Sequence, residues 1–177
     1  ETNTDLIVVG THCRKGISRL FLGKIAESIL LHSRVPLLMV GTHAGAATAI
    51  KSILFPTDFG KVSELVFPKV AALAKSLGAK LCIYHMVPKP ILLPTGIVPP
   101  TDLTKLMDDE KKNAEKELEK YLVQAKENGV EAETVFDLSE NSESEAILSA
   151  AESRNVDLIA MAAQSGAVRS AVAGSTT

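Results

Sequence analysis

One stretch of the sequence predicts the fold of the chain: Asp5-Leu-Ile-Val-Val-Gly10-Thr-His-Cys-Arg-Lys-Gly16-Ile-Ser-Arg-Leu-Phe-Leu-Gly23-Lys24. It begins with an apolar run of strand length, passes through a glycine-containing loop and opens a helical pattern near Gly23. Glycine lets backbone N–H groups come close to phosphate oxygens, and a helix N-terminus adds partial positive charge at the same place. The stretch therefore predicts a strand, a loop of phosphate-binding type and the start of a helix.

A shorter version of this pattern recurs near the end of the chain. Val156-Asp-Leu-Ile-Ala-Met-Ala162 resembles Thr4-Asp-Leu-Ile-Val-Val-Gly10, and another glycine follows in Gly174-Ser175-Thr176. The two copies lie about one domain length apart. We interpret the repetition as the duplication of a domain, because a solenoid repeat would have a much shorter period.

The composition is that of a globular protein and excludes several classes of partner. Hydrophobic residues make up 46% and charged residues 23% of the 177 residues, and the net charge is −2. With no basic excess and no tryptophan, the chain offers little to a nucleic acid, so none is expected as a partner. No apolar run reaches the roughly 18 residues of a membrane-spanning helix, so no membrane partner is expected.

The two cysteines and the start of the sequence bear on where the protein works. Cys13 and Cys82 lie far apart and form no CxxC pattern. Two reduced thiols in a cytoplasmic protein are the first interpretation, and a disulfide is the alternative. The sequence starts almost directly in a strand, without an initiator Met and without the form of a signal peptide. We therefore expect it to be part of a longer gene product.

Residues 1–41 predict a strand, a helix and a second strand. Four consecutive apolar residues, 6–9, are typical of a strand buried on both faces of a parallel sheet. Apolar residues at helical spacing follow Gly23. Val35-Pro-Leu-Leu-Met-Val40 predicts the second strand, where Pro36 favours an edge position or the first residues. The small and polar residues 42–50 are interpreted as a linker.

From Lys51 onward, predicted strands alternate with predicted helices. This order indicates right-handed crossovers and a parallel sheet, and such sheets bind ligands at the carboxyl ends of their strands. Asp58, Val87 and the loop 162–175 all fall at such ends. The predicted strands are 53–55, 80–87, 132–136 and 157–161.

Glycine, proline and serine mark the expected boundaries of the helices between these strands. Gly78 is expected to end the first helix, and Pro68 is expected in its first turn. Gly129 is expected to end a long second helix. Ser142-Glu-Ser-Glu145 has the form of a capping box and predicts the start of the third.

Taken together, these segments resemble the universal stress protein family. The phosphate motif of that family is written G-x2-G-x9-G-[S/T], and the stretch from Gly10 to Lys24 is similar to it. Ile53-Leu-Phe-Pro-Thr-Asp58-Phe looks like the first strand of the family with its acidic end. Three positions depart from the pattern. Cys13 stands for the second glycine, Lys24 for the Ser or Thr, and Ala162 for the first glycine of the second motif.

The resemblance implies an α/β fold of Rossmann-like type, related to the adenine nucleotide alpha hydrolases, with three α/β/α layers and a parallel five-stranded sheet. It also implies a tandem arrangement of domains. Residues 1–41 would be the C-terminal part of a first domain and residues 42–50 a linker. Residues 51–177 would then be a second domain that lacks its last helix and strand.

The resemblance further implies a module that binds ATP, ADP or AMP, with or without Mg²⁺, and acts in the stress response in the cytoplasm. Asp58 matches the acidic residue that contacts the nucleoside, and Val87 matches the residue whose backbone meets adenine. Residues 174–176 match the phosphate end. The implied nucleotide-binding residues are Pro56, Thr57, Asp58, Val87, Ala162, Gly166, Gly174, Ser175 and Thr176, together with Gly10, Gly16 and Gly23 of the first domain.

Other interpretations remain open at this stage. Asp58 could simply cap the helix that follows it. The chain could be a dimeric interaction protein on the same scaffold that binds no nucleotide. No Ser/His/Asp set, metal-ligand cluster or carboxylate pair has a spacing that demands catalysis, so no catalytic or metal site is expected and the chain is not expected to be an enzyme. Residues Val35–Val40 are expected to pair antiparallel with another subunit, giving a homodimer, or to cap the second domain of their own chain.

Overall fold

The computed structural model describes residues 4–11, 24–41, 49–89 and 100–162. These residues divide into two compact units. The first holds β1, α1 and β2, and the second holds the remaining helices and strands. Whether these units correspond to the two expected domains, with a linker at 42–50, stays a prediction.

The first unit is a strand, a helix and a strand, in the order that the sequence predicts. Its elements are β1 (Ile7–Thr11), α1 (Lys24–His32) and β2 (Leu37–Gly41). The two strands are parallel, in register from Ile7 opposite Leu37 to Thr11 opposite Gly41. A parallel pair requires a crossover connection, and α1 lies within it. Several apolar side chains of this unit are exposed, namely Leu6, Val8, Met39 and Val40.

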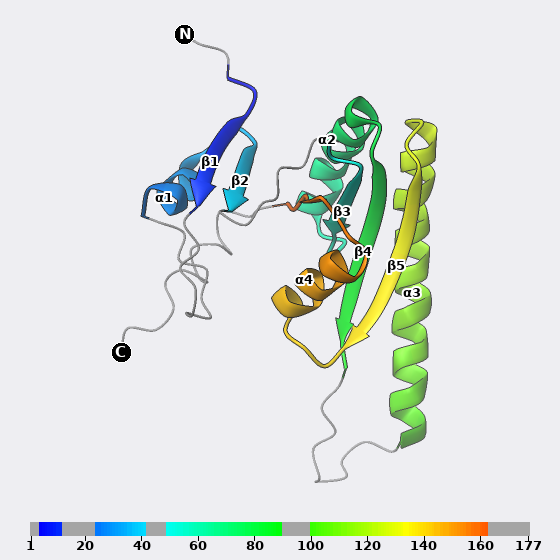
Figure 1. The fold of residues 1–177 in the computed structure, drawn as a ribbon. Coiled ribbons are helices and arrows are strands. Elements are labelled where there is room, and N and C mark those ends of the chain that lie inside the picture. The colour runs from blue at the N-terminus through cyan, green and yellow to red at the C-terminus, as the bar shows by residue number, and fades with distance from the viewer. Residues whose placement is uncertain (1–3, 12–23, 42–48, 90–99, 163–177) are drawn as a thin grey trace, which may run out of the picture. The chain divides into compact units, whose positions relative to one another are not determined.

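The second unit alternates strands and helices around one parallel sheet (Figure 1). Its described strands have the order β5-β4-β3-β6 and all neighbouring pairs are parallel. This confirms the α/β fold class. The described part of the unit shows four strands, where a complete domain was expected to have five. The elements are β3 (Ser52–Pro56), α2 (Lys61–Leu77), β4 (Lys80–Pro88), α3 (Pro100–Glu127), β5 (Ala132–Ser139), α4 (Glu143–Ser153) and β6 (Leu158–Ile159).

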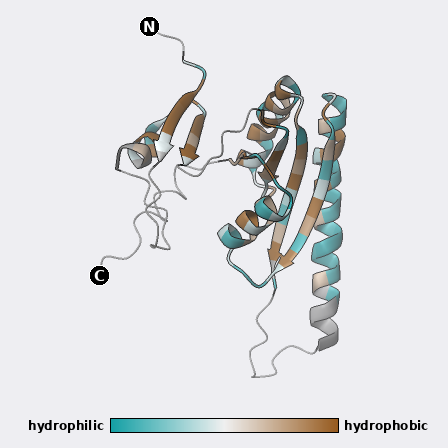
Figure 2. Cartoon of the chain, viewed as in Figure 1, coloured by the Kyte–Doolittle hydropathy of each residue, from teal (hydrophilic) through white to brown (hydrophobic). Residues whose placement is uncertain are grey.

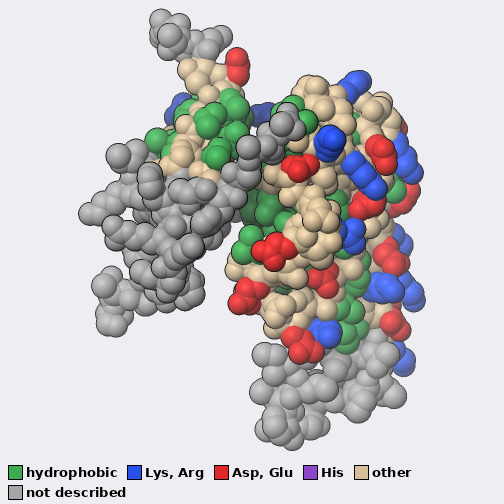
Figure 3. Space-filling model, viewed as in Figure 1, with side chains coloured by type: hydrophobic (Ala, Val, Ile, Leu, Met, Phe, Trp, Pro, Cys, Tyr) green, Lys and Arg blue, Asp and Glu red, His purple; other side chains and the backbone are tan. Residues whose placement is uncertain are grey.

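The helices cover both faces of this sheet because its central strands are apolar on both sides. Ile53 and Phe55 of β3 pack in one buried cluster with residues of α2 and α3. Leu54, which points the other way, packs in a second cluster with Ala151 of α4. Figure 2 shows apolar residues along the central strands and a polar outer side on α3. Figure 3 shows acidic and basic side chains intermixed on the visible surface of this unit.

The side chain of Asp157 fixes how β6 lies against β3. Its Oδ2 accepts hydrogen bonds from the backbone N–H groups of Lys51 at 2.8 Å and Ser52 at 3.0 Å. The Asp157 N–H in turn donates to the Ser52 carbonyl at 3.0 Å. These contacts set the register in which Ile53 lies opposite Leu158. The aspartate of the repeated sequence pattern therefore has a structural role in the second unit.

Two expectations about element boundaries need correction. Pro68 lies inside α2 and not in its first turn, because α2 already begins at Lys61 after the N-cap residue Gly60. The buried face of the helix, which includes Phe67, outweighs the backbone cost of an internal proline. The strand expected at 132–136 extends to Ser139, since β4 pairs with it along its whole length. The predicted capping box at Ser142 is confirmed, as is the end of α2 at Gly78, whose φ is 62°.

Candidate functional site

The order of the strands places a topological switch point at the carboxyl ends of β3 and β6. The chain leaves β3 through α2 toward β4 on one side, and it returns through α4 to β6 on the other side. Helices on opposite faces diverge at such a topological switch point, and parallel α/β sheets bind ligands there. Pro56, Thr57 and Asp58 follow directly from β3 at this point. Ala162 lies three residues after β6.

The turn between β3 and α2 holds the carboxylate of Asp58 in a fixed direction. Its Oδ1 accepts hydrogen bonds from the Gly60 N–H at 2.9 Å and from the Ser63 hydroxyl at 2.6 Å. Both bonds favour the ionised form, and they hold the pKa of Asp58 below its usual value. The second oxygen, Oδ2, has no hydrogen bond from another described residue, and the side chain is exposed. The group is therefore an oriented anion, and its Oδ2 accepts no hydrogen bond from another described residue.

The alternative that Asp58 serves only as a helix cap is partly supported. Asp58 is joined to the first turn of α2 through Ser63, but the N-cap residue is Gly60 and no side chain caps the helix there. One carboxylate oxygen is enough for these structural bonds. A role in the turn and a role toward a ligand are compatible.

Aromatic rings form the wall of the turn on the side of α2 and α3. Phe59 has a φ of 57°, which is unusual for a residue with a large side chain, and its ring stacks on His85 with centroids 4.0 Å apart. The His85 Nδ1 lies 2.8 Å from the Thr57 carbonyl oxygen, so this nitrogen carries the proton and donates it. The buried hydroxyl of Tyr121 has no hydrogen-bond partner among the described residues, and burial raises its pKa.

The end of β4 extends beyond β3, so its last residues have no partner strand on the β3 side among the described residues. β3 ends with Pro56 opposite Tyr84, whereas β4 continues to Pro88 beside β5 (Figure 1). Backbone polar groups in a strand alternate between its two edges. The Tyr84 carbonyl accepts from the Thr57 N–H, so even-numbered residues of β4 face β3. The next such residue is Met86, which no described residue pairs with on that edge.

This alternation identifies a residue that the sequence reasoning missed. The Lys89 N–H donates to the Ser139 carbonyl, so the odd-numbered residues of β4 face β5. The backbone groups of Val87 lie on that side, opposite Leu138. A backbone contact from Val87 to a ligand stays a prediction, but Met86 is the residue whose N–H and C=O lie on the β3 side, beyond the last paired residue of β3. The period of two along β4, counted from its pairing with β3, is the signal that finds it.

The other predicted site residues divide between those that the structure describes and those that it does not. Gly10 lies in β1 of the first unit. Ala162, by the register that places Leu54 opposite Ile159, is level with Thr57. The described residues thus bring together the ends of β3, β4 and β6. Six predicted residues lie outside the described residues: Gly16, Gly23, Gly166, Gly174, Ser175 and Thr176.

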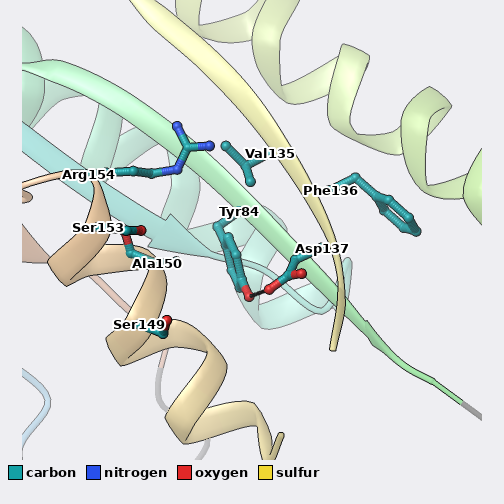
Figure 4. Close-up of a pocket in the computed structure, with 8 residues that line it drawn as sticks. All are labelled: Tyr84, Val135, Phe136, Asp137, Ser149, Ala150, Ser153 and Arg154. Carbon is teal, nitrogen blue, oxygen red and sulfur yellow. Dashed lines mark hydrogen bonds between the residues drawn. The ribbon is translucent and has the colours of Figure 1, made fainter. Parts of the chain in front are cut away.

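A hollow lies between α4 and the strands β4 and β5, away from the ends of β3 and β6 (Figure 4). Its volume is about 290 Å³. The Tyr84 hydroxyl donates to Asp137 Oδ2 at 2.7 Å on its floor, and burial together with this bond raises the pKa of Tyr84. Arg154, at its rim, forms an ion pair with Glu133 at 3.0 Å. None of the predicted site residues lines this hollow.

The described ranges hold neither an arrangement of metal ligands nor a helix that could cross a membrane. No group of three or more His, Cys, Asp or Glu residues within them is arranged to hold a metal ion. No helix within them has the length and apolar character needed to cross a membrane.

Comparison with solved structures gives the fold of known relatives. A universal stress protein from Archaeoglobus fulgidus is 22% identical, with a TM-score of 0.59, over 97% of this chain and 55% of that chain. A universal stress protein from Lactobacillus plantarum is 15% identical, with a TM-score of 0.57, over 68% of this chain and 90% of that chain. A protein of the universal stress protein family from Burkholderia pseudomallei is 21% identical, with a TM-score of 0.56, over 68% of this chain and 86% of that chain. No curated protein matches the chain.

The sequence itself matches the Universal stress protein family over two segments, residues 1–41 and 49–177. These segments cover most of the chain, and the parallel α/β sheet agrees with the solved structures. The chain belongs to the universal stress protein family.

Proposed function

We propose that this chain binds an adenine nucleotide, ATP, ADP or AMP, at the carboxyl ends of β3, β4 and β6, and acts as a regulatory module in the stress response. The observation that carries this proposal is the juxtaposition of two free groups beside the switch point. One is the Oδ2 of Asp58 and the other is the backbone of Met86. Both lie at strand ends where parallel sheets bind ligands.

The chemistry of these two groups suits a nucleoside. An ionised carboxylate accepts hydrogen bonds from the hydroxyl groups of a ribose, as acidic residues do in other nucleotide-binding α/β folds. A backbone N–H beside a backbone C=O offers one donor and one acceptor, which complements the ring nitrogen and the amino group of adenine. The lowered pKa of Asp58 keeps the carboxylate ionised at neutral pH.

The phosphates are assigned from the sequence motif. Gly174, Ser175 and Thr176 follow the pattern of a phosphate-binding loop, with Gly166 and Ala162 before them. Any Mg²⁺ would be held through the phosphates. The proposal gives the chain a binding role and no catalytic one, so release of phosphate from ATP by the purified protein would contradict that part of it.

We also propose that two copies associate through residues Val35–Val40 in the cytoplasm. Met39 is 44% exposed and Val8, on the paired strand β1, is 61% exposed. A sheet of two strands is rarely stable in water unless other groups cover its apolar side chains. The second candidate function, an interaction protein without a nucleotide, is favoured by this exposed apolar surface and by Cys13 and Lys24, which depart from the phosphate motif.

Mass spectrometry of small molecules released from the purified chain tests the proposal. We expect an adenine nucleotide, either retained during purification or bound after incubation with AMP, ADP and ATP in turn. Protein that carries no nucleotide and takes up none of the three at millimolar concentration would favour the interaction protein instead.

A further inference from the structure

The ladder between β3 and β4 lacks one hydrogen bond that the register of the two strands would allow, the bond from the Met86 N–H to the Thr57 carbonyl. The Lys80 N–H donates to the Lys51 carbonyl, and each further pair of residues repeats this step. The same spacing would bring the Met86 N–H to the carbonyl of Thr57. No such bond forms among the described residues, although the neighbouring bond from the Thr57 N–H to the Tyr84 carbonyl is present at 2.9 Å.

The ring of His85 donates to the carbonyl that the Met86 N–H would otherwise reach. Its Nδ1–H donates to the Thr57 carbonyl at 2.8 Å. A side chain on β4 thus replaces the backbone bond from the next residue of the same strand. The consequence is that the Met86 N–H has no partner among the described residues on the β3 edge of β4.

Phe59 holds this ring in place. The two rings are stacked, with centroids 4.0 Å apart and planes inclined by 30°. The left-handed backbone of Phe59, with a φ of 57°, is unfavourable for a residue with a large side chain. The bond from its N–H to Thr57 Oγ1 at 3.0 Å offsets part of that cost. Thr57, Phe59 and His85 therefore contact one another and hold the turn.

We propose that His85, clamped by Phe59, is a positioning residue that ends the β3–β4 ladder at Thr57 and so keeps the Met86 N–H free for the ligand. This inference rests on the proposed function for the identity of the ligand. The end of the β3–β4 ladder at Thr57 does not depend on the proposed function, because the exchange of the Met86 amide can be measured without any ligand. His85 acts through Met86 and needs no contact with the nucleotide.

Two substitutions separate the hydrogen bond of His85 from its bulk. His85→Leu replaces the ring by an apolar side chain of similar size and removes the donor, so the Thr57 carbonyl becomes available to the Met86 N–H. His85→Asn places an amide N–H near the position of Nδ1 and keeps the donor. Phe59→Gly removes the stacked ring, and glycine adopts the positive φ without strain.

The test is amide hydrogen exchange at Met86, measured by NMR on the full chain without nucleotide. We expect fast exchange in the wild type and in His85→Asn, and roughly tenfold slower exchange in His85→Leu, where the amide gains a backbone bond. Phe59→Gly should also slow the exchange of the Met86 amide, by a smaller factor than His85→Leu. A Met86 amide already protected in the wild type, or unchanged exchange in both His85→Leu and Phe59→Gly, would overturn the inference.

A second measurement connects this step to binding. Calorimetric affinity for AMP should fall by about tenfold in His85→Leu, the worth of one hydrogen bond to the ligand, and should be close to the wild type in His85→Asn. Equal losses in both variants would overturn the positioning role. If the wild type binds no adenine nucleotide, the proposed function fails, and the exchange rates alone still decide whether His85 ends the ladder.

Discussion

The hydroxyl of Ser63, on the first turn of α2, donates a 2.6 Å hydrogen bond to Oδ1 of Asp58 at the end of β3. Ser63 is buried, while Asp58 is exposed. A buried donor therefore fixes one oxygen of an exposed carboxylate and leaves the other toward solvent. This relationship explains how a residue on a turn can present an oriented charge without a rigid element of its own.

Ser63→Ala should raise the pKa of Asp58, because the bond from Ser63 is the largest cause of its lowering. A lowered carboxyl pKa contributes stability that is present above the pKa of the unfolded chain and is lost as the pH falls through the folded value. The variant should thus lose about 1 kcal/mol at pH 7, discounted for solvent screening, and less in acid. Urea denaturation at pH 7 and in acid measures the loss of unfolding free energy at each pH. Ser76→Ala, an exposed serine further along α2, is the control, and a loss that does not depend on pH would rule out the linkage.

Gly60→Ala should separate binding from stability. An added Cβ would lie 3.0 Å from both carboxylate oxygens of Asp58, so the carboxylate must move. The backbone of Gly60, with φ −74° and ψ 158°, accepts alanine without strain. We expect the free energy of unfolding to change by less than about 1 kcal/mol, and the affinity for AMP to fall roughly tenfold. In an Asp58→Ala background the same substitution should have no further effect on affinity, and an additive loss would show that Gly60 acts elsewhere.

Pro68→Ala should stabilise the protein. Pro68 lies in the interior of α2, is exposed, and cannot donate the backbone bond that an α-helix uses at that position. Replacing it by alanine should raise the free energy of unfolding by about 1 to 3 kcal/mol, less the entropy that proline removes from the unfolded chain. Thermal and urea denaturation would reveal the change. A lower melting temperature would mean that the proline has a packing role absent from this account.

Much of the second unit was predictable because its patterns are local. The apolar run 53–55 ends at Asp58, so the position of the carboxylate at a strand end followed from the sequence. The capping box at Ser142 likewise needs only four residues to form. Such features depend on neighbours in the chain, which the sequence displays directly.

The features that were missed depend on contacts between distant residues. Whether the backbone of Met86 or of Val87 lies on the β3 side is decided by the register of β4 against β3, in which Lys80 pairs with Ser52. Pro68 is tolerated in a helix because that helix buries its other face on the sheet. The ring of His85 reaches the Thr57 carbonyl only once the two strands are paired. None of these contacts leaves a pattern in a single stretch of sequence.

Leu38→Asp should dissociate the proposed homodimer. Leu38 is in β2, half-buried, within the segment Val35–Val40. A charge placed in an apolar contact between subunits costs several kcal/mol unless it is paired. Light scattering should show the mass of a dimer for the wild type and of a monomer for the variant. Circular dichroism controls for loss of fold, and a folded variant that stays dimeric would direct attention to another interface, with the proline-rich segment 88–100 as the next candidate.

The most direct test of the nucleotide site is the calorimetric affinity for AMP, ADP and ATP of the wild type and of Asp58→Ala. Asp58 Oδ2 is the acceptor that the account gives to the nucleoside, and losing a charged hydrogen-bond partner should weaken binding by about 1 to 3 kcal/mol. Urea denaturation of the same variant reports separately on the turn. We expect weaker binding of the nucleotide to a variant that stays folded. An affinity in Asp58→Ala equal to that of the wild type would contradict it.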